Sequence, residues 1–508
     1  MKPRTLMCFT AIALLAAVAL PLRLAAQQAR YKVIVLPTFG GPQSFIPKDG
    51  ISDIKGAYVR ALINNGTVIG YAETSTPDPG GLCVTSDCFE AHAFRWRDGV
   101  MTDLGALPNY VNSGASAVSA SGLIAGVSEN PFDIDPVLGF PIFRGTLWKG
   151  ETIADVGALT DKGGHTSPAT GVNSRGQVIG FAFTSMPDPF SMLGVGYQAR
   201  AYLSQNGVIQ DLGTLGGPDA EPLLINDKGQ VVGDSYLNST PTNTCYLPLM
   251  TGAFIWEDGH MANLGDLGGT CTNAIALNNR GQVTGTSNLV GDQASHPYLW
   301  EHGSMRDLGT FGGDFGQSMA LNEAGDVVGS ATYPGDQVFR AALWKNGHIK
   351  DIGTLPGDAY SAAVDINSRE QIIGVSFDAQ FTRARAFLWE EGRPMLDLDS
   401  LLVGFGLQLG LGTLTKPAGS GPANINDRGE IVGNAVDANG NWHAVLLIPC
   451  SEGTDGCIDA IEATRSNSAA TASPNRSIIP NRLINPGMMT WRARLQRYHT
   501  LGFGAPRD

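Results

Sequence analysis

The chain has 508 residues and a formal net charge of −13, with 65 glycines and only 16% charged residues. This composition excludes a fold of long, charged helices and favours many short strands joined by glycine turns. The acidic balance argues against nucleic acid as the partner, because surfaces that bind nucleic acids are basic.

Residues 1–26 have the pattern of a secretory signal peptide. Lys2 and Arg4 give a basic start, an apolar stretch runs over residues 11–20, and residues 24–26 end in two alanines. The stretch is shorter than a typical membrane span, and an uncleaved anchor is the alternative. We expect a secreted or cell-surface protein, or a periplasmic one, with no transmembrane span in the mature chain.

One pattern recurs eight times after this segment. An alternating stretch ends in Asn, a tight turn follows, and a Val/Ile-rich stretch ends in Gly, as in residues 274–285. Asn can bond its own downstream backbone, and Gly accepts the positive φ that closes a hairpin. The copies are 44 to 59 residues apart and end at Gly70, Gly126, Gly180, Gly233, Gly285, Gly329, Gly374 and Gly433.

A second pattern follows each copy. It is a strand such as Arg385-Ala-Phe-Leu-Trp389, then a short turn and Asp-Leu-Gly. Six tryptophans share one position in this pattern, and Ser204 and Leu447 replace them in two copies. These six are Trp96, Trp148, Trp256, Trp300, Trp344 and Trp389.

Each module therefore predicts four short antiparallel strands, and such modules must stack to bury their faces. Residues 31–41 match a fourth strand without a module, while the last module, ending at residues 443–447, lacks one. Pairing the two would close a ring and remove its exposed edges. We predict an all-β fold, a closed β-propeller of eight four-stranded blades, over residues 27–449. Seven blades, an open solenoid or another all-β stack are the alternatives.

The repeat resembles the HAF-repeat family of extracellular proteins, named after its His-Ala-Phe triplet. His92-Ala93-Phe94 is the literal match, and residues 211–217 and 225–233 also look like that family. The resemblance covers residues 31–449. It implies location and architecture, and it carries no general activity.

The repeated tryptophans favour packing between blades over stacking on a sugar. The Asp of Asp-Leu-Gly is expected to cap a turn. It is also expected to pair with the His or Arg that opens the third strand of the same or a neighbouring blade, and Arg340 with Asp351 is a same-blade pair that tests this. These acidic positions are Asp103, Asp155, Asp211, Asp307, Asp351 and Asp397, with Asn263 once. The opening residues are His92, Arg144, Arg200, His296, Arg340, Arg385 and His443.

The sequence contains no catalytic motif, and we predict no catalytic residue, no metal ion and no cofactor. Asp133 and Asp135 lack the regular spacing of a calcium loop, and residues 437–441 resemble a fragment of such a loop but are expected to form a plain hairpin turn. The loops between the second and third strands are long only in the first four modules, so a binding site is expected under residues 71–251, where irregular loops share one face. These loops span residues 71–91, 129–143, 181–199 and 234–251.

Six cysteines remain outside the signal segment, and an even count in a secreted chain favours disulfides. Sequence does not fix the pairing, although neighbours within a loop or module suggest three bonds. The candidates are Cys83, Cys88, Cys245, Cys271, Cys450 and Cys457.

The end of the chain changes character. Residues 450–480 read as a disulfide loop and a flexible linker, and residues 481–508 as a basic tail. The tail either touches an anionic surface or docks on the acidic propeller.

We predict a secreted or cell-surface, monomeric, non-enzymatic binding or scaffold protein whose partner is an extracellular protein or glycan. The alternatives are a secreted carbohydrate-active or other hydrolytic enzyme with its site at the propeller mouth, and a purely structural component. Acidic side chains converging from different blades would favour the hydrolase.

Overall fold

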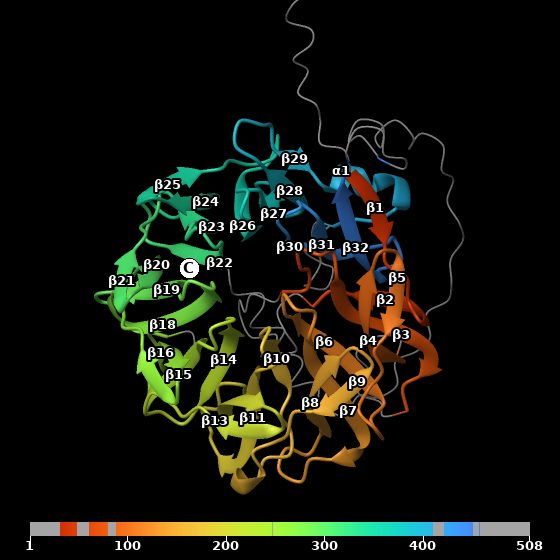
Figure 1. Cartoon of the computed structure of the whole chain (residues 1–508). Coiled ribbons are helices and arrows are strands. Elements are labelled where there is room, and N and C mark those ends of the chain that lie inside the picture. Colours follow the sequence, from red (N-terminus) through yellow and green to blue (C-terminus); the bar gives the residue numbers. More distant parts are fainter. Residues whose placement is uncertain are drawn as a thin grey trace, which may run out of the picture.

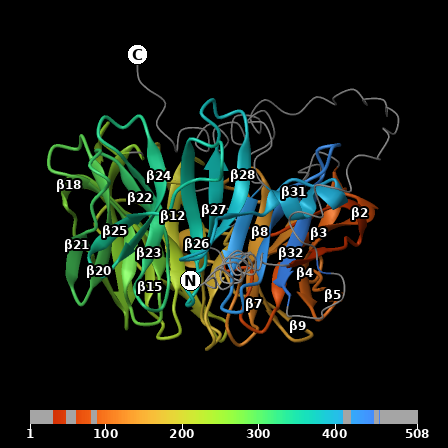
Figure 2. The same ribbon diagram turned by 90° about the horizontal axis from the view of Figure 1, so that it is seen from above.

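A computed structural model describes residues 31–47, 60–79, 88–245, 247–409, 421–450 and 457. These residues form eight four-stranded antiparallel sheets arranged as a closed ring (Figure 1). The first strand of each sheet lines the centre and the fourth forms the outer edge. Seen at right angles, the strands cross the thickness of a disc (Figure 2). The predicted eight-bladed propeller is confirmed.

The first four blades lie in sequence order along the chain. Their strands are β2 (Gly40–Phe45), β3 (Val68–Pro77), β4 (Phe89–Arg97), β5 (Val100–Asp103), β6 (Asn112–Val118), β7 (Ile124–Ile134), β8 (Pro141–Lys149), β9 (Thr152–Asp155), β10 (Ala169–Val172), β11 (Val178–Pro187), β12 (Tyr197–Gln205), β13 (Val208–Asp211), β14 (Ala220–Ile225), β15 (Val231–Pro241), β16 (Leu249–Glu257) and β17 (His260–Asn263).

Blades 5 to 8 follow. Their strands are β18 (Gly268–Leu277), β19 (Val283–Leu289), β20 (Ser295–Glu301), β21 (Ser304–Asp307), β22 (Gly316–Leu321), β23 (Val327–Thr332), β24 (Phe339–Lys345), β25 (His348–Asp351), β26 (Tyr360–Ile366), β27 (Ile372–Phe377), β28 (Ala384–Trp389), β29 (Leu396–Asp397), β30 (Gly421–Ile425), β31 (Ile431–Val436), β32 (Trp442–Pro449) and, closing the ring, β1 (Tyr31–Val35). Three short helical turns are η1 (Thr160–Lys162), α1 (Asp399–Leu402) and η2 (Val403–Phe405).

The ring closes as the sequence predicted. β1 pairs with β32 over its whole length, from Tyr31 opposite Pro449 to Val35 opposite Val445. The red and blue ends of the colour scale therefore meet in one blade (Figure 1). The predicted closing strand was too long, however, because Gly40 already belongs to β2 and pairs with Thr74 of the first blade.

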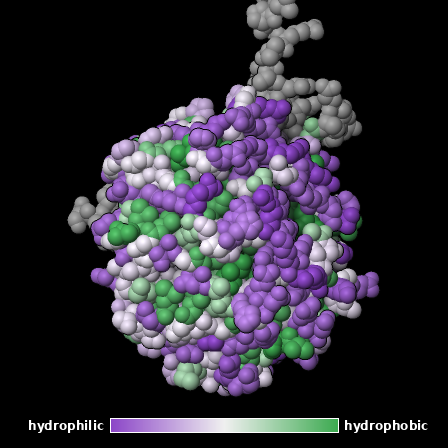
Figure 3. Space-filling model, turned by 60° about the vertical axis from the view of Figure 1, so that its left-hand side comes forward, coloured by the Kyte–Doolittle hydropathy of each residue, from purple (hydrophilic) through white to green (hydrophobic). Residues whose placement is uncertain are grey.

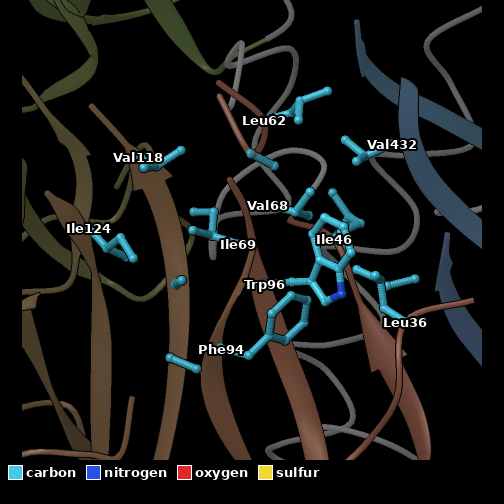
Figure 4. Close-up of a cluster of buried hydrophobic side chains, with 14 of the residues drawn as sticks. Leu36, Ile46, Leu62, Val68, Ile69, Phe94, Trp96, Val118, Ile124 and Val432 are labelled. Carbon is cyan, nitrogen blue, oxygen red and sulfur yellow. The ribbon is translucent and has the colours of Figure 1, made fainter. Parts of the chain in front are cut away.

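The core lies in the seams between blades. Trp344 packs on Leu299 of the preceding blade, and Trp389 packs on Val328 in the same way. At the closing seam, Trp96 lies beside Leu36 of the chain segment that follows β1 (Figure 4). The predicted packing of the tryptophans between blades is confirmed.

The long segments of the first four modules are not irregular loops. They are hairpins, since β3, β7, β11 and β15 have 10 or 11 residues, whereas β19, β23, β27 and β31 have 6 or 7. Each long strand continues past a bulge, and Pro187 lies beyond one of them. Proline lacks an N–H donor and is tolerated at bulges, which hides the strand in the sequence. We call these four hairpins the raised rim.

Two predicted disulfides are present. Cys245–Cys271 joins the raised rim of blade 4 to β18 of blade 5, and Cys450–Cys457 follows β32, with Cα atoms 5.5 and 6.3 Å apart. Cys83 lies outside the described residues, as do the predicted signal segment and basic tail. Among the residues described, no helix has the length and apolar character to cross a membrane. The outer wall carries separated hydrophobic patches among hydrophilic residues (Figure 3).

Candidate functional site

The Asn that ends the first strand joins neighbouring blades. Its Nδ2 donates to the backbone carbonyl of the equivalent residue in the next blade, at 2.9 to 3.4 Å. We call these side chains the asparagine belt. Its members are Asn173, Asn226, Asn278, Asn322, Asn367 and Asn426.

Each belt side chain uses its full hydrogen-bonding capacity, as Asn278 shows. Its Nδ2 donates to Gln282 Oε1 at 2.7 Å and to the Asn322 carbonyl at 3.1 Å. Its Oδ1 accepts the backbone N–H groups of Arg280 and Gln282, both at 3.0 Å. Two donors and two acceptors are therefore satisfied at one buried side chain. The repeat signature fixes both the turn and the seam.

The belt is interrupted at two adjacent seams. The belt position holds Ile63 in blade 1 and Ser119 in blade 2, and neither side chain can make both bonds. Between the turns of blades 2 and 3, the described residues show one weak substitute, from Ser121 Oγ to the Ser174 carbonyl at 3.4 Å. Six seams are closed by an amide, and the seams between blades 1 and 2 and between blades 2 and 3 are not.

The space around each turn glycine shows how closely the neighbouring blades pack at that seam. A Cβ added to Gly281, at φ 89°, would lie 2.9 Å from Gln230 of the preceding blade. At Gly429 the Arg369 guanidinium would lie 2.6 Å away. At Gly122 nothing lies within 4 Å of such an atom. The seam between blades 1 and 2, which lacks a belt bond, is therefore packed less closely than the two belted seams compared with it.

A cation replaces an aliphatic residue at the same place. The residue before the repeated Trp position faces the next blade, and it is Leu or Ile in seven blades, as with Leu343. In blade 1 it is Arg95, which is half-buried. Among the described residues, Arg95 makes no ion pair or side-chain hydrogen bond. A guanidinium thus lines the seam between blades 1 and 2 where other seams have an apolar contact.

A small residue replaces the Trp at the other open seam. In blade 3 the position is Ser204, whose hydroxyl donates to the Val156 carbonyl of blade 2 at 2.7 Å. The equivalent indole of Trp344 donates to the Gly309 carbonyl at 3.2 Å. Ser204 therefore keeps a polar contact to the preceding blade, but its side chain fills much less space than the indole ring found at this position in other blades. The seam between blades 2 and 3 is correspondingly hollow.

Two of these four departures, Arg95 and Ser204, lie in the lining of one groove. The groove has a volume of about 1090 Å³ and opens between the turns of blades 1, 2 and 3, where the two seams lack a belt bond. We call it the belt-gap groove. It lies on the face of the ring formed by the turns between first and second and between third and fourth strands, in the orange to yellow sector of Figure 1.

The groove is cationic in an acidic protein. It holds Arg95, Arg97, Lys149 and Arg175 against two carboxylates. One carboxylate, Asp155, is bound by Arg144 at 2.8 Å, and the other pairs with Arg97 at 3.3 Å. Among the described residues, Arg95, Lys149 and Arg175 have no carboxylate within ion-pair distance. The Arg175 guanidinium lies against Gly229 of blade 4, so Arg95 and Lys149 are the unpaired cations that an anionic ligand in the groove would satisfy.

The belt-gap groove lies on the face opposite to the raised rim, whereas the site is expected under residues 71–251 of that rim. One acidic residue of the rim, Asp135, supports the hairpins themselves. Asp135 is buried, accepts the N–H groups of Val137 and Leu138, and binds the hydroxyl of Thr166. No group of three or more potential ligands placed for a metal ion is found in the described ranges.

The Asp-Leu-Gly residues cap turns as predicted; Asp307, for example, accepts the Gly309 N–H at 2.7 Å. Five of them pair with the opening residue of their own blade, at 2.8 to 3.2 Å. The pairing of Arg340 with Asp351 is wrong, because Tyr333 donates to Asp351 at 2.8 Å and Arg340 donates to the Ala359 carbonyl. His443 pairs with Asp437 instead, since its blade takes its fourth strand from the start of the chain.

The hydrolase alternative needs acidic groups that converge from different blades. Burial raises the pKa of Asp219 to about 7 and that of Asp234 to about 7. Asp219 accepts the Ala199 N–H of blade 3, whereas Asp234 accepts the Ala274 N–H of blade 5. Asp219 and Asp234 face different seams, whereas the charge of Asp188 in blade 3 lies close enough to Asp219 to raise its pKa further.

Of the residues that line the groove, the sequence singled out Asp155 as a turn cap and Ser204 as a departure from the repeat, and assigned neither to a binding site. A signal was available in the register of the eight copies. Ile63, Ser119 and Arg95 each depart from a residue type shared by six or seven other modules. Only the blade order shows that these departures lie at adjacent seams.

No family model matches this chain, and no curated protein does. Among solved structures it is similar to the β-propeller domain of the trilobed protease from Pyrococcus furiosus, with 12% identity, a TM-score of 0.39, and coverage of 68% of this chain and 96% of that one. It is also similar to Pyrococcus horikoshii acylaminoacyl peptidase, with 10% identity, a TM-score of 0.39, and coverage of 77% of this chain and 59% of that one. Polysaccharide lyase Uly1 has 8% identity and a TM-score of 0.35, with coverage of 84% of this chain and 98% of that one. These likenesses are too distant to indicate a function.

Proposed function

We propose that this chain is a secreted, monomeric, non-enzymatic binding propeller that holds an anionic extracellular ligand in the belt-gap groove, and that it belongs to the HAF-repeat family. One observation carries the proposal: four departures from the repeat, at residues 63, 95, 119 and 204, fall at two adjacent seams. Each departure removes apolar volume or a seam bond, or adds positive charge. Such losses persist where the surrounding structure and a ligand compensate for them.

Export is supported by the N-terminal pattern and by the two disulfides, which form in oxidising compartments. A binding role is supported by the unpaired cations. Positive charge gathered in a concave surface of an otherwise acidic protein attracts anions over a distance of several ångströms.

The test is a titration calorimetry panel of three polyanions, namely poly-L-glutamate, polygalacturonate and dextran sulfate, at 50 and 300 mM NaCl. We expect at least one to bind, more weakly at the higher salt concentration. Ser204→Trp refills the groove and Arg95→Leu restores the residue type of the other seams. Each should weaken binding by about tenfold or more, the equivalent of ~1.4 kcal/mol.

The matched control is Arg306→Leu. Arg306 is an exposed cation of β21 in blade 5, outside the groove lining, and its loss changes the net charge as Arg95→Leu does. Binding by this variant should stay within about twofold of wild type, since the charge lies at a belted seam. The proposal fails if no polyanion binds, or if Ser204→Trp and Arg95→Leu bind as the wild type does.

A further inference from the structure

We infer that the ligand of the belt-gap groove is an extended acidic peptide segment of a partner protein, with carboxylate side chains interleaved with aliphatic ones. This inference rests on the proposed function and names its ligand class. Three features of the groove support it: its cations, its aliphatic side chains and its polar side chains.

The cations favour a ligand with several carboxylates along its length. Arg95 comes from β4 of blade 1 and Lys149 from the end of β8 of blade 2, whereas the Arg175 guanidinium lies against Gly229 of blade 4. Two unpaired cations from adjacent blades match an anionic chain better than one small anion. Guanidinium groups bind carboxylates through two parallel N–H donors.

Aliphatic side chains separate these cations. Val100 is 64% exposed at the start of β5, and Leu123 and Leu147 line the same groove. The described lining contains no aromatic residue. A sugar chain would therefore find no ring on which to stack, whereas Val, Leu or Ile side chains of a peptide would find apolar contacts.

Polar groups in the lining suit a peptide backbone. An extended segment presents unpaired N–H and C=O groups that need partners when it is covered. The side chains of Thr102 and Asn206 line the groove. Their hydroxyl and amide groups would supply donors and acceptors to a bound backbone.

The experiment is an immobilised array of randomised octapeptides probed with the full-length protein, followed by fluorescence anisotropy titration of the best binder. We expect the bound peptides to contain two or more Asp or Glu residues with Val, Leu or Ile between them. Replacing every Glu by Gln should abolish binding. Arg95→Leu and Ser204→Trp should each reduce affinity by about tenfold, as for the loss of a central interface residue, and Arg306→Leu should not.

Octagalacturonate is titrated in parallel as the carbohydrate probe. If it binds in an Arg95-dependent manner and no peptide does, the peptide inference is overturned while the anion-binding function stands. If neither probe binds the wild type, both are overturned. If peptides bind without enrichment in acidic residues, or bind Ser204→Trp equally well, the inference about the groove is wrong.

Discussion

Blades 4 to 8 and blades 1 to 3 share the same four strands and differ in how they are joined. Each seam from blade 3 round to blade 1 is closed by an asparagine whose amide is fully bonded, as with Asn278. The two remaining seams lack it and contain Arg95 or Ser204 instead of an apolar residue. A repeat protein can therefore form its scaffold from positions that share a residue type across its copies, and form a binding site at positions where single copies differ.

The raised rim adds a second contrast within the same blades. Blades 1 to 4 carry long hairpins on one face, while blades 1 to 3 carry the belt-gap groove on the other. The hairpins attract attention in the sequence because they are long and irregular. The groove is made by single substitutions that leave the length of the repeat unchanged.

The largest expected effect is on the seam tryptophans. Trp344 is 3% exposed and packs on the preceding blade. Trp344→Ala should lower the free energy of unfolding by about 3–5 kcal/mol, because a large cavity is left between blades. Urea denaturation followed by tryptophan fluorescence and circular dichroism measures it.

The matched variant is Ser204→Ala, at the same repeat position in an open seam. It removes one buried hydrogen bond, so a loss of only about 1 kcal/mol is expected. Equal losses for the two variants would show that the open seam is packed as tightly as the others, and the comparison between the regions would collapse.

The belt provides the next prediction. Asn278→Ala leaves the Gln282 side chain and the Asn322 carbonyl without their partner, and should lower the free energy of unfolding by about 2–3 kcal/mol. Ser119→Asn should instead raise it by about 1 kcal/mol, because the new amide is at the belt position from which it can donate to the Asn173 carbonyl of blade 3. A stabilisation by Ser119→Asn that also weakens ligand binding would link the gap to the site. Destabilisation by Ser119→Asn would argue that the gap is needed for folding.

Arg95→Leu should stabilise the protein without ligand. It replaces an unpaired, half-buried guanidinium by the residue type found at the equivalent position of other seams, for a gain of about 1 kcal/mol. Thermal unfolding in the absence of any polyanion provides the measurement. A lower melting temperature would mean that Arg95 has a structural partner, contrary to its role in the groove.

The smallest effect concerns pH. The hydrogen bond that His92 donates to Asp103, at 2.8 Å, raises the pKa of His92 above its ordinary value of 6.5, although burial opposes it. For Asp103, burial acts upward, but the hydrogen bonds from His92 and the Gly105 N–H outweigh it and lower its pKa.

A raised histidine pKa gives stability that is fully present below pH 6.5 and is lost as the pH rises through the folded value. His92→Gln should therefore cost most at pH 6 and little at pH 9, in melting temperatures recorded across that range. The lowered pKa of Asp103 gives stability that is lost only in acid, as the pH falls through its folded value. A cost for His92→Gln that is the same at every pH would exclude a protonated His92 in the pair.

Much of the fold could be predicted, because the repeat encodes it locally. Alternation gives the strands, Asn and Gly give the turns, and the unmatched strand near Tyr31 gives the closure. The rim hairpins could not be recognised, because their bulges interrupt the alternation. The predicted pairing of Arg340 with Asp351 was wrong, because the Tyr333 hydroxyl donates to Asp351 instead.

The site could not be predicted for a different reason. Contacts between blades involve residues about 50 positions apart, such as Asn226 and Asn278, and no local pattern shows them. The same holds for Arg95, which reads as an ordinary strand residue until its seam is known. Only the residues that depart from the repeat indicated the site, and such departures are usually treated as random variation.

Hydrogen–deuterium exchange with and without bound poly-L-glutamate tests the central claim most directly. The account predicts slower exchange on binding in the turns of blades 2 and 3, residues 119–123 and 174–178, with no change in the belted turns at residues 278–282 and 322–326. Protection confined to the raised rim, at residues 183–188 and 236–241, would contradict it and would place the site on the opposite face of the ring.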